Sequence, residues 1–366
     1  MKATYSAFAG CCPALGRGLI WGALAIAGFG VPARANLVIQ PVYSSDISPD
    51  AQVVIQSAIK FYADNFKGNV TVTVGFGSQA GGGASATYGI EQVSYTEYLK
   101  QLKGNLTEGQ TDVSALASLP AASPLGNGQI IMTETLAANL GLGVQNAAAV
   151  IATGSNCAGL SVQACVAYGA AYLTGGANNT PSAGLFGVTE HEINEVLGTA
   201  SSLSSGATAT VASAADLFRY SALNTRSWSN NPSTGTPCGS GTPDAYLSVD
   251  GGKTNAAAYN NCNNGGDYGD FQSPGGTPQV QDAFGPTNNP TFLTLTSPEA
   301  ILLDAAGWNY VSSPTVAVGT PSPVTEKAVF IGSQIEGVST PEPSTIFLLG
   351  TGLAAFCGFA RRRSRA

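Results

Sequence analysis

Residues 189–198 read Thr189-Glu190-His191-Glu192-Ile193-Asn194-Glu195-Val196-Leu197-Gly198. His191 is the only histidine of the 366-residue chain, and three glutamates surround it although charged residues make up only 10% of the sequence. Apolar residues precede and follow these charges, and Gly198 is the residue type that commonly ends a helix, so we predict a buried helix over residues 185–199. The interpretation of the whole chain depends on what this helix carries.

Residues four apart lie on the same face of a helix, so His191 and Glu195 can bind one metal ion together. Glu192 projects about 100° away around the helix axis, beside such an ion. The spacing is that of the helical metalloprotease motif H-E-x-x-H with glutamate in place of the second histidine. A glutamate placed like Glu192 takes a proton from metal-activated water and passes it to the leaving amine. The alternative is a surface histidine among ordinary helix-forming glutamates, but unpaired carboxylates would be costly on a buried helix.

A catalytic zinc needs three protein ligands and an open coordination position. The best third candidate is Asp216, and its distance downstream of His191 resembles the acidic ligand of the gluzincin class of zinc peptidases. Tyr220, four residues further on, is a candidate for holding the oxyanion that forms during hydrolysis. Asp216 fits nearly as well as an N-cap of the segment that follows it, and the sequence leaves both roles open.

The metal itself is less closely defined than its ligands. A set of one histidine and two carboxylates is rich in hard oxygen donors, so calcium or manganese can compete with zinc. Asp250, Asp267 and Asp270 lie in glycine-rich turns and are candidates for a structural Ca²⁺. For Asp250 we favour a simple turn role, because Asp-Gly forms tight turns without any ion.

The first 35 residues have the pattern of a signal peptide. Lys2 and Arg17 precede an apolar run over residues 19–31, and Ala33-Arg34-Ala35 follows it. This order of charge, apolar run and small residues predicts export through the Sec machinery and cleavage after Ala35.

Residues 341–366 have the pattern of a second processing segment. They begin with Pro341-Glu342-Pro343, continue with 15 apolar residues at 346–360 and end in an arginine cluster. The apolar run is short for a spanning helix but sufficient for transient anchoring in the inner membrane, with the arginines in the cytoplasm. The three features in this order resemble the PEP-CTERM sorting tail of Gram-negative bacteria. The resemblance implies recognition by an exosortase and release to the cell surface or extracellular polymer; the alternative is an ordinary membrane anchor.

The segment left after processing, residues 36–340, is strongly acidic. Seven of the 15 Lys and Arg residues lie in the two ends but only one of the 22 Asp and Glu residues, which leaves 8 positive and 21 negative charges, a net of −13. Such a surface repels phosphates and anionic lipids, so we expect no nucleic-acid partner.

Four of the seven cysteines fall within this segment: Cys157, Cys165, Cys238 and Cys262. An even number of cysteines in an exported chain predicts two disulfides. Proximity along the chain favours Cys157–Cys165 and Cys238–Cys262 among the three possible connectivities.

Strand and helix patterns alternate along residues 36–312, which predicts an α/β (α+β) catalytic domain with long loops. A Pro/Ser/Thr-rich stalk is expected over residues 313–340. We predict strands over residues 36–43, 69–75, 129–132, 147–152 and 245–249, and helices after Ser48-Pro49, over residues 95–102, 112–119, 134–140 and 185–199, and from Ser297 onward.

Several blocks of residues 36–310 resemble a bacterial family of secreted zinc metalloproteases. Its members share a motif helix H-E-I-S-E-V-M/L-G, a D-L-F-R-Y-S segment and an S-x-D-G-G-x-T-N turn, and many end in a PEP-CTERM tail. The matching blocks here are residues 190–198, 216–221, 248–255, 266–270 and 304–310. The resemblance implies a zincin-like fold and a family in which glutamate at position 195 is normal.

The sequence thus predicts an exported, surface-sorted zinc metalloendopeptidase that acts on peptide or protein substrates. His191, Glu195 and Asp216 are the expected metal ligands, and Glu192 and Tyr220 the expected catalytic residues. The alternative is a non-catalytic extracellular matrix or surface protein that retains a metalloprotease-like fold.

Overall fold

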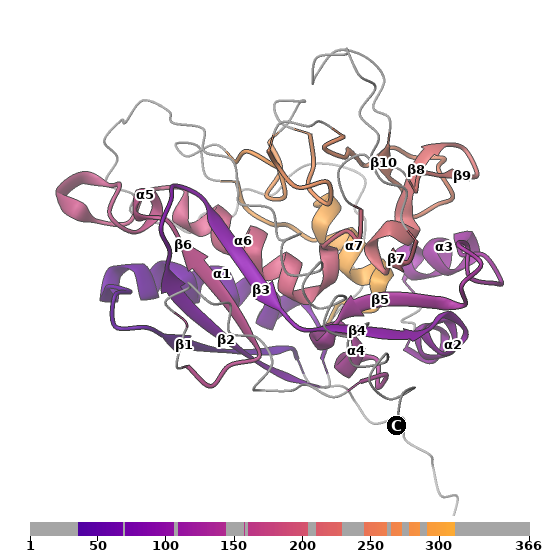
Figure 1. Cartoon of the computed structure of the whole chain (residues 1–366), viewed down its shortest axis with the longest axis horizontal. Coiled ribbons are helices and arrows are strands. Elements are labelled where there is room, and N and C mark those ends of the chain that lie inside the picture. Colours follow the sequence, from indigo (N-terminus) through magenta and orange to yellow (C-terminus); the bar gives the residue numbers. More distant parts are fainter. Residues whose placement is uncertain are drawn as a thin grey trace, which may run out of the picture. The chain divides into compact units, whose positions relative to one another are not determined.

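A four-stranded mixed sheet supports the motif helix in the computed structural model of the protein (Figure 1). The strand order is β1–β2–β6–β3, in which β1, β2 and β6 are parallel and β3 is an antiparallel edge strand. The strands span Val38–Tyr43 (β1), Thr71–Ser78 (β2), Ala164–Tyr168 (β6) and Ala84–Tyr88 (β3).

The structure describes residues 36–68, 70–105, 109–143, 157, 160–203, 210–228, 245–261, 265–272, 278–285 and 291–311. The predicted signal peptide, stalk, sorting tail and strand at 147–152 lie outside these residues, so the predicted domain boundaries stay predictions. Within the described ranges, the helices are all too short or too polar to cross a membrane.

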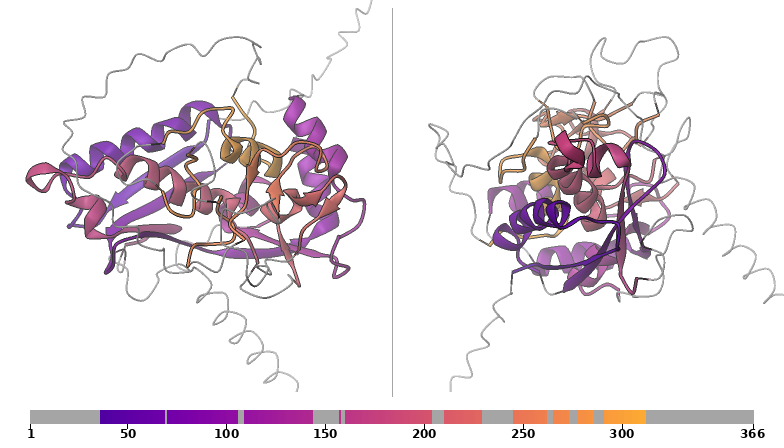
Figure 2. Two further views of the ribbon diagram at one scale, coloured as in Figure 1. Left: turned by 90° about the horizontal axis from the view of Figure 1, so that it is seen from above. Right: turned by 90° about the vertical axis from the view of Figure 1, so that its left-hand side faces the viewer.

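Two helices pack side by side on the sheet: α1 (Pro49–Asn65) and α6 (Leu185–Asn194). Helix α1 begins as its sequence predicts, because the Ser48 side chain accepts the backbone N–H of Ala51 at 3.2 Å and Pro49 needs no N–H partner. Its buried face includes Tyr62, whose hydroxyl shares its single proton between the Glu190 carbonyl of α6, at 2.7 Å, and Asn194 Oδ1, at 2.8 Å. Helix α6 lies against α1 and against strands β3 and β6, and Figure 2 shows this pairing from two further directions.

The motif helix widens at its C-terminal end into a π-helical turn, η2 (Glu195–Thr199). Gly198 has a φ of 124°, which an L side chain rarely adopts, so the predicted glycine stop falls at this residue. The indole N–H of Trp308 donates to the carbonyl of Leu197 at 2.7 Å. The turn that carries Glu195 is thereby fixed to the end of the last helix.

Two smaller sheets and further helices complete the described residues, and the expectation of a mixed α/β fold is confirmed. One sheet has the order β4–β5–β7 and the other β11–β10–β8–β9. Their strands are β4 (Ile90–Ser94), β5 (Gln129–Thr133), β7 (Ala212–Ser213), β8 (Arg219–Ala222), β9 (Thr225–Arg226), β10 (Tyr246–Leu247) and β11 (Ala257–Ala258). The helices are α2 (Tyr95–Asn105), α3 (Gln110–Ser118), α4 (Glu134–Asn139), α5 (Ala170–Leu173), α7 (Pro298–Ala306) and the short 3₁₀ turns η1 (Ala177–Asn179) and η3 (Ala215–Phe218).

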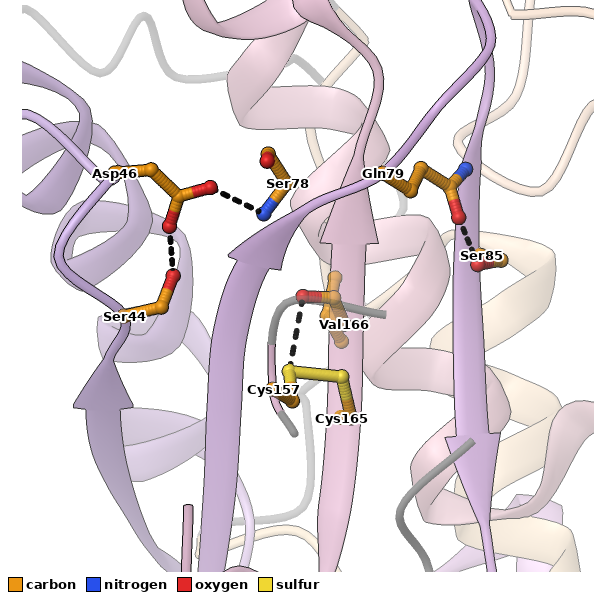
Figure 3. The surroundings of a disulfide bond; sticks show 8 residues. All are labelled: Ser44, Asp46, Ser78, Gln79, Ser85, Cys157, Cys165 and Val166. Atoms are coloured by element: carbon orange, nitrogen blue, oxygen red, sulfur yellow. Dashed lines mark hydrogen bonds between the residues drawn. A yellow bond between two sulfur atoms is a disulfide. The ribbon is translucent and has the colours of Figure 1, made fainter. Parts of the chain in front are cut away.

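The predicted disulfide between Cys157 and Cys165 is confirmed (Figure 3). It attaches the segment before β6 to the strand itself, and a side chain at Gly75 on the neighbouring strand β2 would approach the Cys157 sulfur to 3.2 Å. The second predicted disulfide, between Cys238 and Cys262, lies outside the described residues.

Replacing Cys157 and Cys165 together by serine should lower the free energy of unfolding by about 2–3 kcal/mol, the loop-entropy value for so short a loop. Urea unfolding of the non-reduced proteins measures the loss. Labelling with a thiol-reactive reagent is the control: in the non-reduced wild type, neither Cys157 nor Cys165 should react. Equal stability of the two proteins would contradict the stabilising role of this disulfide.

Two buried acids lie on helices α3 and α7, which pack against each other. Asp112 and Asp304 are each only 2% exposed. Burial raises the pKa of Asp304 to about 8, and the charge of Asp112 contributes to this rise, against the backbone N–H of Tyr310, which lowers it. The folded protein therefore keeps a proton on Asp304 at neutral pH that the unfolded chain releases.

Because the pKa of Asp304 is higher in the folded state, its contribution to stability is complete below pH about 4 and is lost as the pH rises toward about 8. The loss amounts to at most about 1.4 kcal/mol per pH unit. Asp304→Asn removes the titration while keeping a hydrogen-bond donor, so its stability should fall less steeply with pH than that of wild type. Urea unfolding of both proteins across the mildly acidic to mildly basic range measures this; parallel slopes would contradict the assignment.

Candidate metal centre

The centre of the site is formed by His191 and Glu195 of the motif helix together with Asp270 of a distant loop. His191 Nε2 lies 4.0 Å from Glu195 Oε1 and 3.4 Å from Asp270 Oδ1. One ligand atom from each residue lies within 4.8 Å of the others. The three side chains are only 3%, 4% and 1% exposed, so the prediction of a buried helix is correct and a surface position of His191 is excluded.

The imidazole of His191 is oriented by its other nitrogen. Nδ1 lies 3.0 Å from the carbonyl oxygen of Val280, which can only accept, so Nδ1 carries the proton. In the neutral ring, Nε2 then presents its lone pair to the two carboxylates. This is the tautomer that a metal-binding histidine needs.

Glu192 is fully buried, and among the described residues neither of its carboxylate oxygens makes a hydrogen bond of normal geometry. Burial raises the pKa of Glu192 to about 8, and Asp270 and Asp267 contribute to the rise. The charge of His191 and the nearby backbone N–H of Ala86 on β3 lower it. A carboxylate so placed is poised to accept a proton.

Burial and nearby carboxyl groups also raise the pKa of Glu195. Burial raises its pKa well above the ordinary value, and the charges of Glu192, Asp270 and Asp267 add to the rise, whereas His191 lowers it. Three buried carboxyl groups, those of Glu192, Glu195 and Asp270, therefore lie around one imidazole, and the partly buried Asp267 adds its charge. An unpaired buried charge is costly, and a divalent cation would offset that cost.

The spacing of the ligand atoms is compatible with a single cation. Ligands about 2.1 Å from a tetrahedral zinc lie about 3.4 Å apart, which matches the distance between His191 and Asp270. The longer distance to Glu195 requires a small closing movement for zinc and less movement for a larger ion such as Mn²⁺ or Ca²⁺. The residues present thus fit one divalent cation, with Glu192 beside it.

Backbone hydrogen bonds on both sides fix the loop that carries Asp270. The N–H of Asn260 donates to the Asp270 carbonyl at 2.7 Å, and the N–H of Phe271 donates to the carbonyl of Gln281 at 2.7 Å. Arg219 is completely buried and donates to the carbonyl of Tyr268 at 2.9 Å, which holds the same loop from β8.

The structure does not bring Asp216 into this group. Its carboxylate accepts hydrogen bonds from Ser201, Ser202 and Ser213, the last through the backbone N–H at 3.0 Å. Ser213 Oγ in turn accepts the N–H of Asp216 at 3.1 Å, a reciprocal pair of the capping-box type at the start of η3. The hydrogen bonds of Asp216 are therefore close to the capping role that the sequence leaves open. Asp270, and not Asp216, is the carboxylate that converges with His191 and Glu195.

Asp216 supports the centre indirectly. It holds Ser201 and Ser202, which follow closely after the π-helical turn. A side chain at Gly269 would come within 2.9 Å of the Ser201 backbone, so the loop before Asp270 packs against this held segment. Asp216 therefore holds the segment against which the loop that carries Asp270 packs.

Asp216→Ala should lower the free energy of unfolding by about 3 kcal/mol, because it leaves several buried donors without an acceptor. Asp216→Asn keeps one acceptor oxygen and should lose less. Both losses are measured by urea unfolding in the presence of a chelator. If Asp216→Asn instead had wild-type stability but no metal affinity, Asp216 would be a ligand after all.

Tyr220 has other neighbours. The guanidinium of Arg226 lies 4.8 Å above its ring, and a side chain at Gly252 would touch that ring. Tyr88, the last residue of edge strand β3, lies close enough to the acidic cluster for the charges of Glu195, Asp267, Glu192 and Asp270 to act on its hydroxyl. Burial raises the pKa of Tyr88, and Glu195 is the largest electrostatic contributor to that rise.

The structure uses Asp250 within its own turn. Its carboxylate accepts from Ser248 Oγ at 2.7 Å and from the N–H and hydroxyl of Thr254 at 2.9 and 2.6 Å. Across the described ranges, His191, Glu195 and Asp270 form the one group of three potential ligands that converges. Asp270, predicted as a possible calcium ligand, is therefore found in the histidine centre instead.

Residues 339–364 match the PEP-CTERM protein-sorting motif. The predicted sorting tail is thereby confirmed: the protein is exported and sorted to the cell surface or extracellular space of a Gram-negative bacterium, and exosortase recognises its tail. No curated protein and no solved structure matches the chain.

Proposed function

We propose that the protein is a metal-dependent peptidase that works outside the cell. In this proposal His191, Glu195 and Asp270 hold one divalent cation, with zinc as the ion expected from the motif, and Glu192 is the general base. The observation that carries the proposal is the convergence of three buried ligand atoms within 4.8 Å of one another beside a buried glutamate that lacks hydrogen bonds of normal geometry.

The surrounding fold supports a zincin-like interpretation. Helix α6 packs against β3, the antiparallel edge strand of the sheet, and Tyr88 ends that strand close to the acidic cluster. An extended peptide bound along β3 would therefore lie near Glu192.

When bound, the cation would polarise the scissile carbonyl and lower the pKa of a water molecule. Glu192 would take a proton from water and deliver it to the leaving amine, since the nearby backbone N–H of Ala86 makes no hydrogen bond of normal geometry with either of its oxygens. The hydroxyl of Tyr88 would stabilise the oxyanion in the role that the sequence assigns to Tyr220.

The test compares Glu192→Gln with wild type, using protein purified after export and a quenched fluorescent peptide library as substrate. Loss of the general base should lower kcat/KM by about 10²–10⁴-fold while one equivalent of metal, determined by mass spectrometry, remains bound. The matched control is Glu190→Gln. The carboxylate of Glu190 lies on another side of the helix, where it accepts the N–H of Leu293 at 3.0 Å. This control should retain most of the wild-type rate.

Equal cleavage by wild type and Glu192→Gln would exclude Glu192 as the base. Stoichiometric metal without any cleavage would favour the alternative of a non-catalytic surface protein. Absence of stoichiometric metal from the wild type would overturn the proposal altogether.

A further inference from the structure

Two consecutive residues, Val280 and Gln281, contact two of the three proposed ligands. The carbonyl of Val280 accepts from His191 Nδ1 at 3.0 Å, and Gln281 Nε2 donates to Asp270 Oδ1 at 3.0 Å. A short segment that is distant in sequence from the motif helix therefore determines how a histidine and a carboxylate face each other.

All four polar groups of Gln281 are engaged. Its backbone N–H donates to Glu299 Oε1 at 2.8 Å, and its carbonyl accepts the N–H of Phe271 at 2.7 Å. Its side-chain Oε1 accepts from Asn194 Nδ2 at 3.2 Å, while Nε2 holds Asp270. The residue is 2% exposed, and it joins helix α7, the Asp270 loop and helix α6 at one point.

The chemistry of the contacts sets the orientation of the amide. A carboxylate that binds a metal carries no proton, so it can only accept, and Gln281 must present its NH₂ group to Asp270. The carbonyl end of Gln281 then faces Asn194, whose own carbonyl accepts from the hydroxyl of Tyr62 at 2.8 Å. Tyr62 thus completes a chain of donors that all point toward Asp270.

We propose that Gln281 is the positioning residue of the metal centre, with its amide holding Asp270 in the orientation that lets it share a cation with His191 and Glu195. This inference rests on the proposed metal-binding function. Oδ1 of Asp270 is held by the amide, and among the described residues Oδ2 has no donor. Without the amide, the carboxylate could rotate away from the imidazole at little cost.

The decisive variants are Gln281→Met, which keeps length but has no amide, and Asn194→Leu, which removes the Asn194–Gln281 hydrogen bond and leaves the Asp270 contact intact. Zn²⁺ and Mn²⁺ affinities are measured by competition with a chromophoric chelator on metal-stripped protein, and thermal stability is measured in EDTA. Gln281→Met should bind both ions about 10–100-fold more weakly, as is typical when a group that orients a ligand is lost. Asn194→Leu should lose markedly less affinity than Gln281→Met at a comparable or larger cost in Tm.

The charge-neutral control for a glutamine-to-methionine change is Gln79→Met. Gln79 lies after strand β2 and bonds Gly83 and Ser85, as Figure 3 shows for Ser85. It should retain wild-type affinity. Should Gln281→Met fail to fold, Gln281→Asn provides the second variant, because its shorter amide cannot reach Asn194 and Asp270 together, and the same loss is expected.

Unchanged affinity in a folded Gln281 variant, or equal losses in Gln281→Met and Asn194→Leu, would overturn the positioning role while leaving the metal centre intact. Weakened affinity in a protein that cleaves no peptide would uphold it and overturn only the peptidase. A wild type that binds neither ion would overturn both.

Discussion

The structure around helix α6 depends on one constraint: several carboxyl groups are buried around a single imidazole. Taking an ionised carboxylate out of water costs several kcal/mol even after the protein relaxes, and each like charge nearby adds to that cost. In the metal-free state the protein can limit the cost only by keeping protons on groups such as Glu192 and Glu195, whose pKa values burial raises. A divalent cation is the partner that would let these groups be buried and ionised at the same time. The acidic cluster is therefore easier to explain as a binding centre than as part of an ordinary core.

The sequence predicted the local elements of the site well, because their signals lie within a few residues of each other. The helix over 185–199, its stop at Gly198 and the alignment of His191 with Glu195 all follow from helical periodicity and glycine conformation. Strands β3 and β6 were not predicted, because their sequences carry no strong local signal. Residues 84–88 alternate, but their buried residues are two alanines, which are too small to give a strong apolar signal. Residues 164–168 are buried on both faces, so they lack the period-two pattern of a half-exposed strand.

The third candidate ligand could not be chosen from sequence. Asp216 and Asp270 both follow the motif helix as acids in loop-rich sequence, and only the path of the chain decides which one returns to His191. That path is set by contacts far apart in sequence, such as the hydrogen bond that the buried Arg219 donates to the carbonyl of Tyr268. The block that includes Asp216 and Arg219 lies outside the group formed by His191, Glu195 and Asp270. Its residues act by holding the segments that flank the centre, which spacing alone does not reveal.

The motif helix is held by contacts on several of its sides. Within little more than one turn, Glu190 bonds the backbone of Leu293, Glu192 faces β3, and Asn194 bonds Tyr62 and Gln281. Several directions around the helix axis are therefore occupied by different elements. A helix held from several sides cannot easily rotate or shift to suit a ligand, so the remaining adjustment must come from the loop residues that approach it. The geometry of the proposed centre therefore depends on the position of Asp270. In our proposal, the amide of Gln281 sets that position.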